Sequence, residues 1–509
     1  MIRTLPYLSA ILSIPVLAQP GRLDMDFGMG GIARTTVAAE FVEVGAVEVL
    51  PDQRILAGGY AYIDNAGDIL LARLLPDGGM DPEFGNAGVV IHDDGNTEYA
   101  VDLALLDDGN FLVLAERFVS TSQSDILLLR FNSNGTLDGS FGTNGRVILE
   151  GATSDIPSSM VVRPDGRLLI AGGRLEAGNG SMLIWGLLAD GTIDTDFGTS
   201  GLVLIDVTPQ ADQAQGIALQ EDGRIVLGGR GQGDSPGNVG IVAARLLADG
   251  TLDGTFGTNG TVALGGNSSI TSIANVVVGS DGKILLGGHT QNMGAVNQTL
   301  VRFDSNGELD NSLDGDGILY HAVGLYAFTN AMVHQPDGRI ILGGAGTDDG
   351  FVLTRFTSVG DVDLTFSDGV EDNIAQVVTA FPGNYTQVEA LALQADGQVL
   401  AGGGVANDLV IVRYQNSVTS AVKEQPTARR FHVYPNPIGA DGLIRFDLEG
   451  MQDPIRLELL DTSGQVVQSN FWNASAPAVI DVHALAPGSY VVRAHYRDGL
   501  RSVATVVMP

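Results

Sequence analysis

Short apolar runs alternate along most of the chain with clusters of Asp, Gly and Asn, and this alternation repeats about every 57 residues from residue 23 to residue 414. In one such unit, residues 101–105 alternate apolar and polar side chains, which is typical of a half-buried strand. An Asp-Gly turn follows, and residues 111–114 lead back as a second strand. Further apolar runs at residues 89–91 and 126–129 bring the unit to four extended segments. Because none of them has the i, i+3, i+4 spacing of an amphipathic helix, each unit is expected to hold strands alone.

The most regular part of the unit is the phrase Asp-Gly-Arg-Leu-Leu-Ile-Ala-Gly-Gly at residues 165–173. Asp and Gly tolerate the positive φ of a tight hairpin turn. The closing glycines, Gly172 and Gly173 in this copy, permit a bulge or a close backbone approach at the end of the strand. Because the phrase recurs, we expect it to build the fold rather than to bind phosphate. The six related copies occupy residues 52–59, 108–115, 222–229, 281–288, 337–344 and 396–403.

Seven units of four strands predict an all-β fold, a seven-bladed β-propeller over residues 19–420. A β-helix is disfavoured because its coils are usually shorter and because it needs a cap at each end. Residues 23–28 match the closing segment of a repeat, but no repeat precedes them. The last repeat, which includes residues 409–414, lacks this closing segment. We therefore predict that a strand near residues 32–37 completes the last blade and closes the ring.

An arginine follows one apolar run in six of the seven units, and the third unit has Gly186 in its place. A ring of arginines could bind an anion. Repetition in nearly every unit favours a structural role instead, in which each arginine pairs with a repeated aspartate such as Asp81 or Asp138 and links one blade to the next. The six arginines are Arg73, Arg130, Arg245, Arg302, Arg355 and Arg413.

Two phrases of the unit, at residues 135–142 and 164–173, resemble the delta-60 repeat, which is regarded as a propeller-forming bacterial repeat. Both phrases recur in register through residues 23–414. The resemblance implies a propeller and brings with it no catalytic and no cofactor-binding residue.

The first 18 residues have the pattern of a secretory signal peptide. A basic start at Arg3 precedes an apolar run at residues 5–17 that is too short to span a bilayer as a mature helix. Small or tolerated residues before Gln19 predict cleavage between Ala18 and Gln19. Export by the Sec machinery is expected, and no transmembrane segment is expected in the mature protein.

The repeat pattern stops before a polar linker at residues 421–430, and several short strands follow in residues 431–509. Their number and spacing predict a small immunoglobulin-like β-sandwich. This stretch resembles the type A C-terminal sorting domain of the type IX secretion system. The resemblance implies passage across the outer membrane of a Bacteroidota-type bacterium, whereas an accessory binding sandwich is the alternative. The residues of the sorting motif are Tyr434, Pro435, Asn436, Pro437, Gly488 and Tyr490.

The charge of the chain excludes some partners. Acidic residues outnumber basic ones 60 to 27, for a net charge of −33, and nearly all of this excess falls in residues 1–420. Nucleic acid and anionic lipid both require clustered Lys and Arg, so neither is an expected partner. The chain has no cysteine, so strand packing rather than disulfides must stabilise it.

Candidate sites are sought where the repeat symmetry breaks. Asp310, Asp314 and Asp316 lie in a Gly-containing loop that could surround Ca²⁺ with oxygens, although the closing bidentate Glu of a calcium loop is missing and a turn variant is the alternative. No other cofactor is expected. Tyr60, Tyr62 and Trp185 could stack on sugars or simply pack. Longer inserts occur at residues 231–238, 289–297, 320–330 and 370–387, where binding residues would lie if these loops share one face.

The sequence contains no recognisable catalytic motif: His residues do not occur as HExxH, no phosphate loop is present, and no nucleophile elbow is present. The sequence therefore predicts a monomeric, secreted or surface-exposed binding protein whose extracellular ligand is a carbohydrate or a protein. The alternative is an extracellular polysaccharide-active enzyme, a glycoside hydrolase or lyase, on a propeller scaffold.

Overall fold

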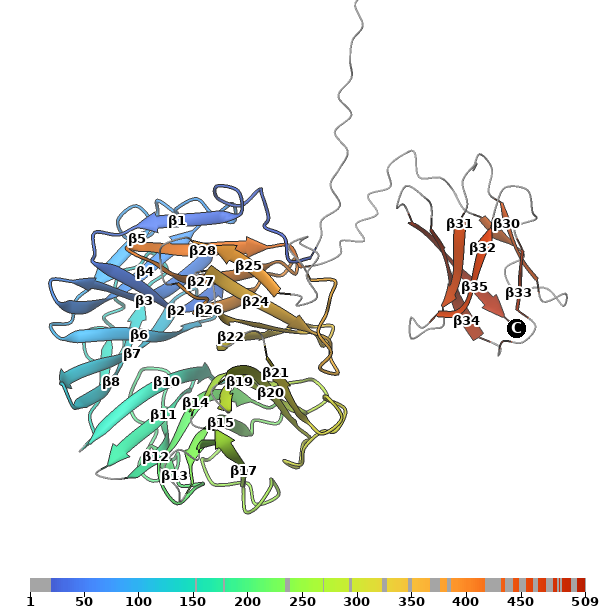
Figure 1. Cartoon of the computed structure of the whole chain (residues 1–509). Coiled ribbons are helices and arrows are strands. Elements are labelled where there is room, and N and C mark those ends of the chain that lie inside the picture. The colour runs from blue at the N-terminus through green and yellow to red at the C-terminus, as the bar shows by residue number, and fades with distance from the viewer. Residues whose placement is uncertain are drawn as a thin grey trace, which may run out of the picture. The chain divides into compact units, whose positions relative to one another are not determined.

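The computed structural model describes most of the repeat region and the strands of the C-terminal region. The chain divides into two compact units, Met1–Val418 and Thr419–Pro509 (Figure 1). Every element of the described residues is a strand. These residues are 20–416, apart from 152, 177–178, 234–238, 269, 293–294, 323–326, 347–349, 367–375 and 382–385, together with 432–434, 443–447, 455–460, 466–472, 479–482, 485, 488–495 and 501–508.

The first unit is a seven-bladed β-propeller, which confirms the predicted fold (Figure 1). Each blade is a sheet of four antiparallel strands, and in six blades the strands pair in chain order. These six are β2 (Phe41–Val49), β3 (Ile55–Ile63), β4 (Ala66–Leu74), β5 (Val89–His92); β6 (Thr97–Leu105), β7 (Phe111–Ser120), β8 (Gln123–Phe131), β9 (Arg146–Leu149); β10 (Ser154–Val162), β11 (Leu168–Glu176), β12 (Asn179–Leu187), β13 (Leu202–Ile205); β14 (Asp212–Leu219), β15 (Ile225–Gln232), β16 (Val239–Leu246), β17 (Thr261–Ser268); β18 (Ile270–Val278), β19 (Ile284–Asn292), β20 (Ala295–Phe303), β21 (Ile318–His321); and β22 (Phe328–His334), β23 (Ile340–Ala345), β24 (Gly350–Phe356), β25 (Gln376–Ala380).

The seventh blade joins the two ends of the array. It consists of β26 (Ala390–Leu393), β27 (Val399–Val405), β28 (Asp408–Tyr414) and, as its outer strand, β1 (Ile32–Thr36) from the start of the chain. β1 pairs with β28 from Ile32↔Val412 to Thr36↔Asp408. Asp24 adds an ion pair to Arg413 at 2.8 Å. The predicted strand near residues 32–37 is thus confirmed as the element that closes the ring.

The core lies between neighbouring blades, because each sheet is covered on both sides. In β8, Ile126, Leu127, Leu128 and Leu129 all have 0% exposure. Leu127 and Leu129 belong to the apolar cluster shared with blade 1, whereas Ile126 and Leu128 belong to the cluster shared with blade 3. This double burial explains why the strands read as continuous apolar runs instead of alternating ones.

The recurring phrase forms the turn and the second strand of each blade. Gly166 has φ 83°, and Gln53, which stands at the same place in the first copy, still takes φ 69°. The inner strand has a bulge opposite the end of the phrase, for example between Pro157 and Ser159. A Cβ at Gly172 would lie 2.0 Å from the Ile156 carbonyl oxygen, so this glycine is required by close backbone approach.

The two ends of the ring differ in composition. The Asp-Gly turns between first and second strands lie at one end with the segments that connect third and fourth strands; we name this end the repeat face. The opposite end, the variable face, carries the hairpins between second and third strands and the crossings to the next blade. In blade 1 the registers Phe41↔Tyr62 and Ile69↔His92 place four strand ends on the variable face.

The described ends of three long inserts lie on the variable face, whereas the fourth insert runs from one face to the other. β15 and β16, β19 and β20, and β21 and β22 flank the inserts at residues 231–238, 289–297 and 320–330. The insert at residues 370–387 contains β25, whose two ends lie on opposite faces. Residues 234–238, 293–294, 323–326, 370–375 and 382–385 of these inserts lie outside the described residues.

The second unit contains two antiparallel sheets, as the predicted immunoglobulin-like sandwich requires. One sheet has the order β29-β30-β33 and the other β32-β31-β34-β35. The strands are β29 (His432–Tyr434), β30 (Leu443–Asp447), β31 (Ile455–Leu460), β32 (Val466–Trp472), β33 (Val479–Asp481), β34 (Gly488–His495) and β35 (Arg501–Met508).

Removing the closing strand is expected to destabilise the whole propeller. A chain that begins at Ala38 lacks Phe27 and Ala33, which are 0% and 5% exposed, and Val37, which is 6% exposed. At about 1.5–3 kcal/mol for each large buried side chain, the unfolding free energy should fall by about 3 kcal/mol or more. The exposed edge of β28 should also promote association. Urea unfolding against a control chain that begins at Gln19 measures the loss; equal midpoints would contradict this role of β1.

Candidate functional site

The repeated arginines fill the repeat face with ion pairs. Each reaches an aspartate at the start of the segment that leads to the fourth strand. Arg355 also donates to the Asn416 carbonyl at 2.9 Å and lies over the Phe366 ring at 4.6 Å, so its guanidinium is occupied on several sides. The pairs are Arg73–Asp81 at 2.7 Å, Arg130–Asp138 at 3.1 Å, Arg245–Asp253 at 2.9 Å, Arg302–Asp310 at 2.7 Å, Arg355–Asp363 at 3.0 Å and Arg413–Asp24 at 2.8 Å.

The third blade replaces this arrangement. The ring of Phe197 packs directly against Gly186, where a Cβ would lie 2.7 Å from the ring. Arg167, from the recurring phrase, reaches Asp194 at 3.0 Å instead. The repeat face therefore keeps its aspartate paired even where the usual arginine is missing.

The calcium candidates lie on this same face. Asp310 is 2.7 Å from Arg302 and 2.9 Å from Lys283. Burial acts against it, but hydrogen bonds from Lys283, Ser312 and Arg302 hold the pKa of Asp310 far below its usual range. Asp316 accepts the Ile318 N–H at 2.9 Å, and Asp314 takes φ 49°. Calcium binding by Asp310, Asp314 and Asp316 stays a prediction. Lys283 and Arg302 would compete with a calcium ion for the carboxylate of Asp310.

A narrow channel runs through the middle of the ring. All seven innermost strands contribute to its lining, and its cavity measures about 180 Å³. Ligand pockets for small molecules usually measure about 300–1,000 Å³, so this space is small for a sugar chain.

Polar side chains near the bulges of the inner strands form hydrogen bonds to the next blade around the wall of this channel. Their types differ from blade to blade, so the repeat pattern does not reveal them. The Met160 N–H donates to Asp102 at 2.7 Å, the Ile273 N–H to Gln215 at 3.0 Å, and the Val44 N–H to Glu389 at 2.7 Å; Asn275 donates to the Met332 carbonyl at 3.2 Å, and Asn330 to the Val388 carbonyl at 3.1 Å.

Three channel carboxyls hold their protons unusually tightly. Burial and then the charge of Asp102 raise the pKa of Glu48 to about 7. Burial raises the pKa of Asp102 to about 6, although it accepts hydrogen bonds from Met160, Leu103 and Ser159. Burial also raises the pKa of Glu389 to about 8. Such shifts occur at catalytic sites and equally in structural networks.

An aromatic cluster occupies the variable face of blades 1 and 2. It consists of Phe41, Tyr60, Tyr62, Tyr99 and Phe118, which are all partly exposed. Phe41 stacks on Tyr62 with ring centroids 4.9 Å apart, and Tyr60 stacks on Tyr99 at 4.1 Å. An edge contact between Tyr60 and Phe41 at 6.1 Å joins the two pairs, and Phe118 meets Tyr99 at 5.0 Å. The cluster thus forms one continuous aromatic surface from four strands.

Local structure explains how these rings come together. The registers Phe41↔Tyr62 and Thr97↔Phe118 bring rings together within or beside each hairpin. A Cβ at Gly67 would lie 2.4 Å from the Tyr99 ring, so only glycine lets blade 2 approach blade 1 here.

Carboxylates border the aromatic cluster. The Tyr60 hydroxyl donates to Glu43, and burial together with this bond raises the pKa of Tyr60. Burial raises the pKa of Glu116, which pairs in register with Tyr99. Two of the sequence candidates, Tyr60 and Tyr62, belong to this cluster. Trp185 instead packs beside the core between blades 2 and 3, and its indole N–H is 3.5 Å from Asp155.

The residues linked to export are partly described. Tyr434 ends β29, and Gly488 and Tyr490 belong to β34. Ala18 and Gln19 at the predicted cleavage site, and Pro435, Asn436 and Pro437 of the sorting motif, lie outside the described residues.

Two family profiles match the chain. A β-propeller family described as a domain of unknown function (DUF5122) matches residues 50–84, 108–141, 163–197, 220–256, 279–313 and 335–366. A secretion system C-terminal sorting domain matches residues 432–507. Comparison with curated proteins finds no match to this sequence.

Several solved structures resemble this chain at low sequence identity. A catalytically inactive virginiamycin B lyase from Staphylococcus aureus, solved with quinupristin, is 10% identical at a TM-score of 0.43, covering 75% of this chain and 98% of its own. The polysaccharide lyase Uly1 is 10% identical at 0.43, covering 82% and 95%. Sqt1 from Chaetomium thermophilum is 12% identical at 0.39, covering 76% and 98%. At these values the likeness carries no argument about activity.

The fold and the two profiles define the class of repeat β-propeller proteins that end in a sorting domain, and the chain belongs to this class. Six segments of its propeller match the DUF5122 β-propeller repeat, which confirms the recognised repeat, and residues 432–507 match a secretion system C-terminal sorting domain. This domain indicates export through the type IX secretion system to the cell surface or the extracellular space. None of the described segments is a helix long and apolar enough to cross a membrane.

Replacing Glu389 with Gln is expected to reduce the pH dependence of stability. The carboxyl has a pKa near 8 when folded and an ordinary value of 4.5, so the folded state holds its proton more tightly and wild-type stability falls as pH rises between these values. A Gln side chain can still accept the hydrogen bond from the Val44 N–H, and because it does not ionise, its contribution to stability does not fall as pH rises. Because one pKa unit corresponds to about 1.4 kcal/mol, Glu389→Gln should be more stable than wild type by at least about 1 kcal/mol at pH 9 and similar at pH 5.

Urea unfolding of both proteins at the two pH values measures this difference. Glu83 is an exposed glutamate on the repeat face and serves as the control position, because Glu83→Gln should leave the profile unchanged. A wild-type pH profile in Glu389→Gln would contradict the role assigned to burial of this carboxyl.

Proposed function

We propose that the mature protein is an exported binding protein that holds a neutral extracellular carbohydrate on the aromatic cluster of blades 1 and 2. The observation that carries the proposal is the continuous contact of five partly exposed rings drawn from two blades. Rings of this kind supply large, rigid contact surfaces with little loss of side-chain entropy. The C–H faces of a pyranose ring pack well on such a surface.

The carboxylates at the edge supply the polar part of the proposed site. Glu43 accepts a hydrogen bond from the Tyr60 hydroxyl, and Glu116 stands opposite Tyr99 in the strand register. Their oxygens are suited to accept hydrogen bonds from sugar hydroxyls. A few polar groups beside an aromatic surface are the usual composition of a ligand site.

Charge narrows the class of carbohydrate. The chain carries a net charge of −33, and the groups that border the cluster are acidic. A uronate-rich or sulfated polymer would be repelled from this face. A neutral or amino-sugar glycan would not be, and the proposal therefore names neutral glycans.

An extracellular polysaccharide-active enzyme is the second candidate, and the coupled carboxyls Glu48 and Asp102 favour it. Their pKa values near 7 and 6 suit general acid–base work. Against this, Asp102 already accepts three hydrogen bonds that join or order the inner strands. The channel cavity of about 180 Å³ is also small for a polymer.

Removing one outer ring should weaken carbohydrate binding. Tyr62→Ala deletes a ring that stacks on Phe41, and we expect the dissociation constant for a neutral soluble polysaccharide to rise at least about tenfold, or about 1.4 kcal/mol. Affinity electrophoresis followed by calorimetry on the best glycan measures the change. Tyr320→Ala is the matched control, since Tyr320 is 58% exposed on β21 and lies outside the cluster.

Three results would count against this function. Equal loss in Tyr62→Ala and Tyr320→Ala would remove the aromatic cluster from the site. Tight binding of anionic polymers alone would reverse the charge argument. Release of new reducing ends, abolished in Glu48→Gln but retained in Tyr62→Ala, would favour the enzyme.

Export is tested separately from ligand binding. Deleting residues 431–509 should leave the propeller in the periplasm, because the sorting domain directs passage through the outer membrane. Sec export with cleavage between Ala18 and Gln19, in a Bacteroidota-type bacterium, is part of the proposal, so the retained protein should begin at Gln19 on N-terminal sequencing. Cell fractionation locates the protein, and full-length Tyr62→Ala should be exported like wild type. Normal secretion of the truncated chain would refute the sorting role.

A further inference from the structure

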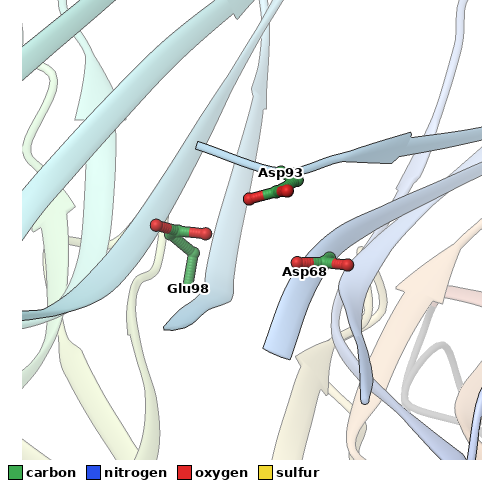
Figure 2. Close-up of side chains that lie close together, drawn as sticks. All are labelled: Asp68, Asp93 and Glu98. Atoms are coloured by element: carbon green, nitrogen blue, oxygen red, sulfur yellow. The ribbon is translucent and has the colours of Figure 1, made fainter. Parts of the chain in front are cut away.

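Three carboxylates meet where blade 1 passes into blade 2. Asp68 belongs to β4, Asp93 directly follows β5, and Glu98 belongs to β6 (Figure 2). One oxygen of each lies within 4.8 Å of the others, and among the described residues this is the acidic or histidine group close enough to share an ion. We name it the blade-junction cluster. It is separate from the calcium candidates around Asp310, which lie on the repeat face.

The buried member of the cluster has an unpartnered oxygen. Glu98 has 0% exposure, and its Oε2 accepts no hydrogen bond within the described part of the chain. The Asn96 N–H donates at 3.1 Å to the other oxygen, Oε1. Figure 2 shows the Glu98 carboxylate directed into the space that Asp93 and Asp68 also face. A buried carboxylate oxygen without a donor is costly unless a cation or a proton satisfies it.

Asp93 and Asp68, the other two members, have few hydrogen-bond partners among the described residues. The Gly95 N–H donates to Oδ1 of Asp93 at 2.7 Å, so the crossing segment orders this side chain through one oxygen. Asp68 accepts no hydrogen bond from the residues that the structure describes. Burial, then Asp93 and Asp64, raise the pKa of Asp68. Burial and then Asp94 raise the pKa of Glu98 to about 7.

Nearby basic groups are engaged elsewhere. Arg146 pairs with Asp94 at 2.6 Å, and Arg117 lies 3.5 Å from Asp125. Neither forms an ion pair with the three clustered carboxylates. Among the described residues, no basic side chain forms an ion pair with the cluster, although Arg117 stands opposite Glu98 in the strand register.

We propose that Asp68, Asp93 and Glu98 bind a divalent cation, Ca²⁺ in preference to Mg²⁺, that fastens the crossing between blades 1 and 2. Oxygen-only ligands suit hard cations. Calcium ligand distances of about 2.3–2.6 Å allow two ligand atoms to lie up to about 5 Å apart, whereas magnesium distances of about 2.0–2.1 Å do not span the same separation. Asp93 is exposed and provides the route by which the ion enters.

The test is a calorimetric titration of CaCl₂ into the chain from Gln19 to Pro509, with MgCl₂ titrated in parallel. A dissociation constant on the order of 10⁻⁴–10⁻³ M is expected for calcium, the range of extracellular sites, with weaker magnesium binding. Asp68→Asn and Glu98→Gln should each weaken calcium binding at least tenfold. Glu83→Gln is the control, since it removes an exposed carboxylate outside both groups of calcium candidates and should bind like wild type. Asp314→Asn reports separately on the other calcium candidate.

Thermal unfolding adds a readout that misfolding cannot imitate. In chelator, Glu98→Gln should melt at the same or a higher temperature than wild type, because it removes an unpaired buried charge. In 5 mM calcium, about five times the upper end of the expected range, wild type should melt at a higher temperature and the variant should not. Two results would overturn the proposal. One is the absence of calcium binding at 10 mM, roughly ten times the upper end of that range. The other is loss of binding in Asp314→Asn but not in Glu98→Gln.

Discussion

Burial of every central strand between two neighbouring sheets is the constraint on which the propeller depends. Ile126 and Leu128 face one neighbour while Leu127 and Leu129 face the other, so no blade can end the array without exposing an apolar surface. The ring must therefore close, and the chain does this by pairing β1 with β28. Apolar burial of this kind, about 25 cal/mol per Å², outweighs any single polar contact in the fold.

The repeat face and the variable face of the propeller differ in which side chains they carry. On the repeat face, the same arginine, aspartate and phenylalanine recur, as in Arg73 stacked over Phe84 and paired with Asp81. These side chains satisfy one another and leave little for a ligand. Among the residues that the structure describes, the variable face carries no such recurring set. Its side chains are free to differ between blades, and the aromatic cluster and the blade-junction cluster both lie there.

Charge links these two clusters. Bases number 27 against 60 acids, and many of the bases are held in ion pairs on the repeat face. Acidic groups also lie beside the rings of the aromatic cluster: Glu43 and Glu116 border them, and Glu98 directly precedes Tyr99 in β6. A surface of this composition is compatible with neutral sugars and cations, and it disfavours polyanions.

The sequence alone determined the architecture, because period, turn chemistry and apolar runs are local properties that recur in every blade. Asp165 to Gly173, the pairing role of Arg73 and its counterparts, and the closing strand could all be read from such patterns. The site could not. Tyr60 and Tyr62 were visible only as isolated aromatics, and Phe41, Tyr99 and Phe118 join them through strand register and the packing of blade 2 against Gly67. Asp68, Asp93 and Glu98 likewise come together only because three strands of two blades end at one place, a juxtaposition that tertiary structure alone decides.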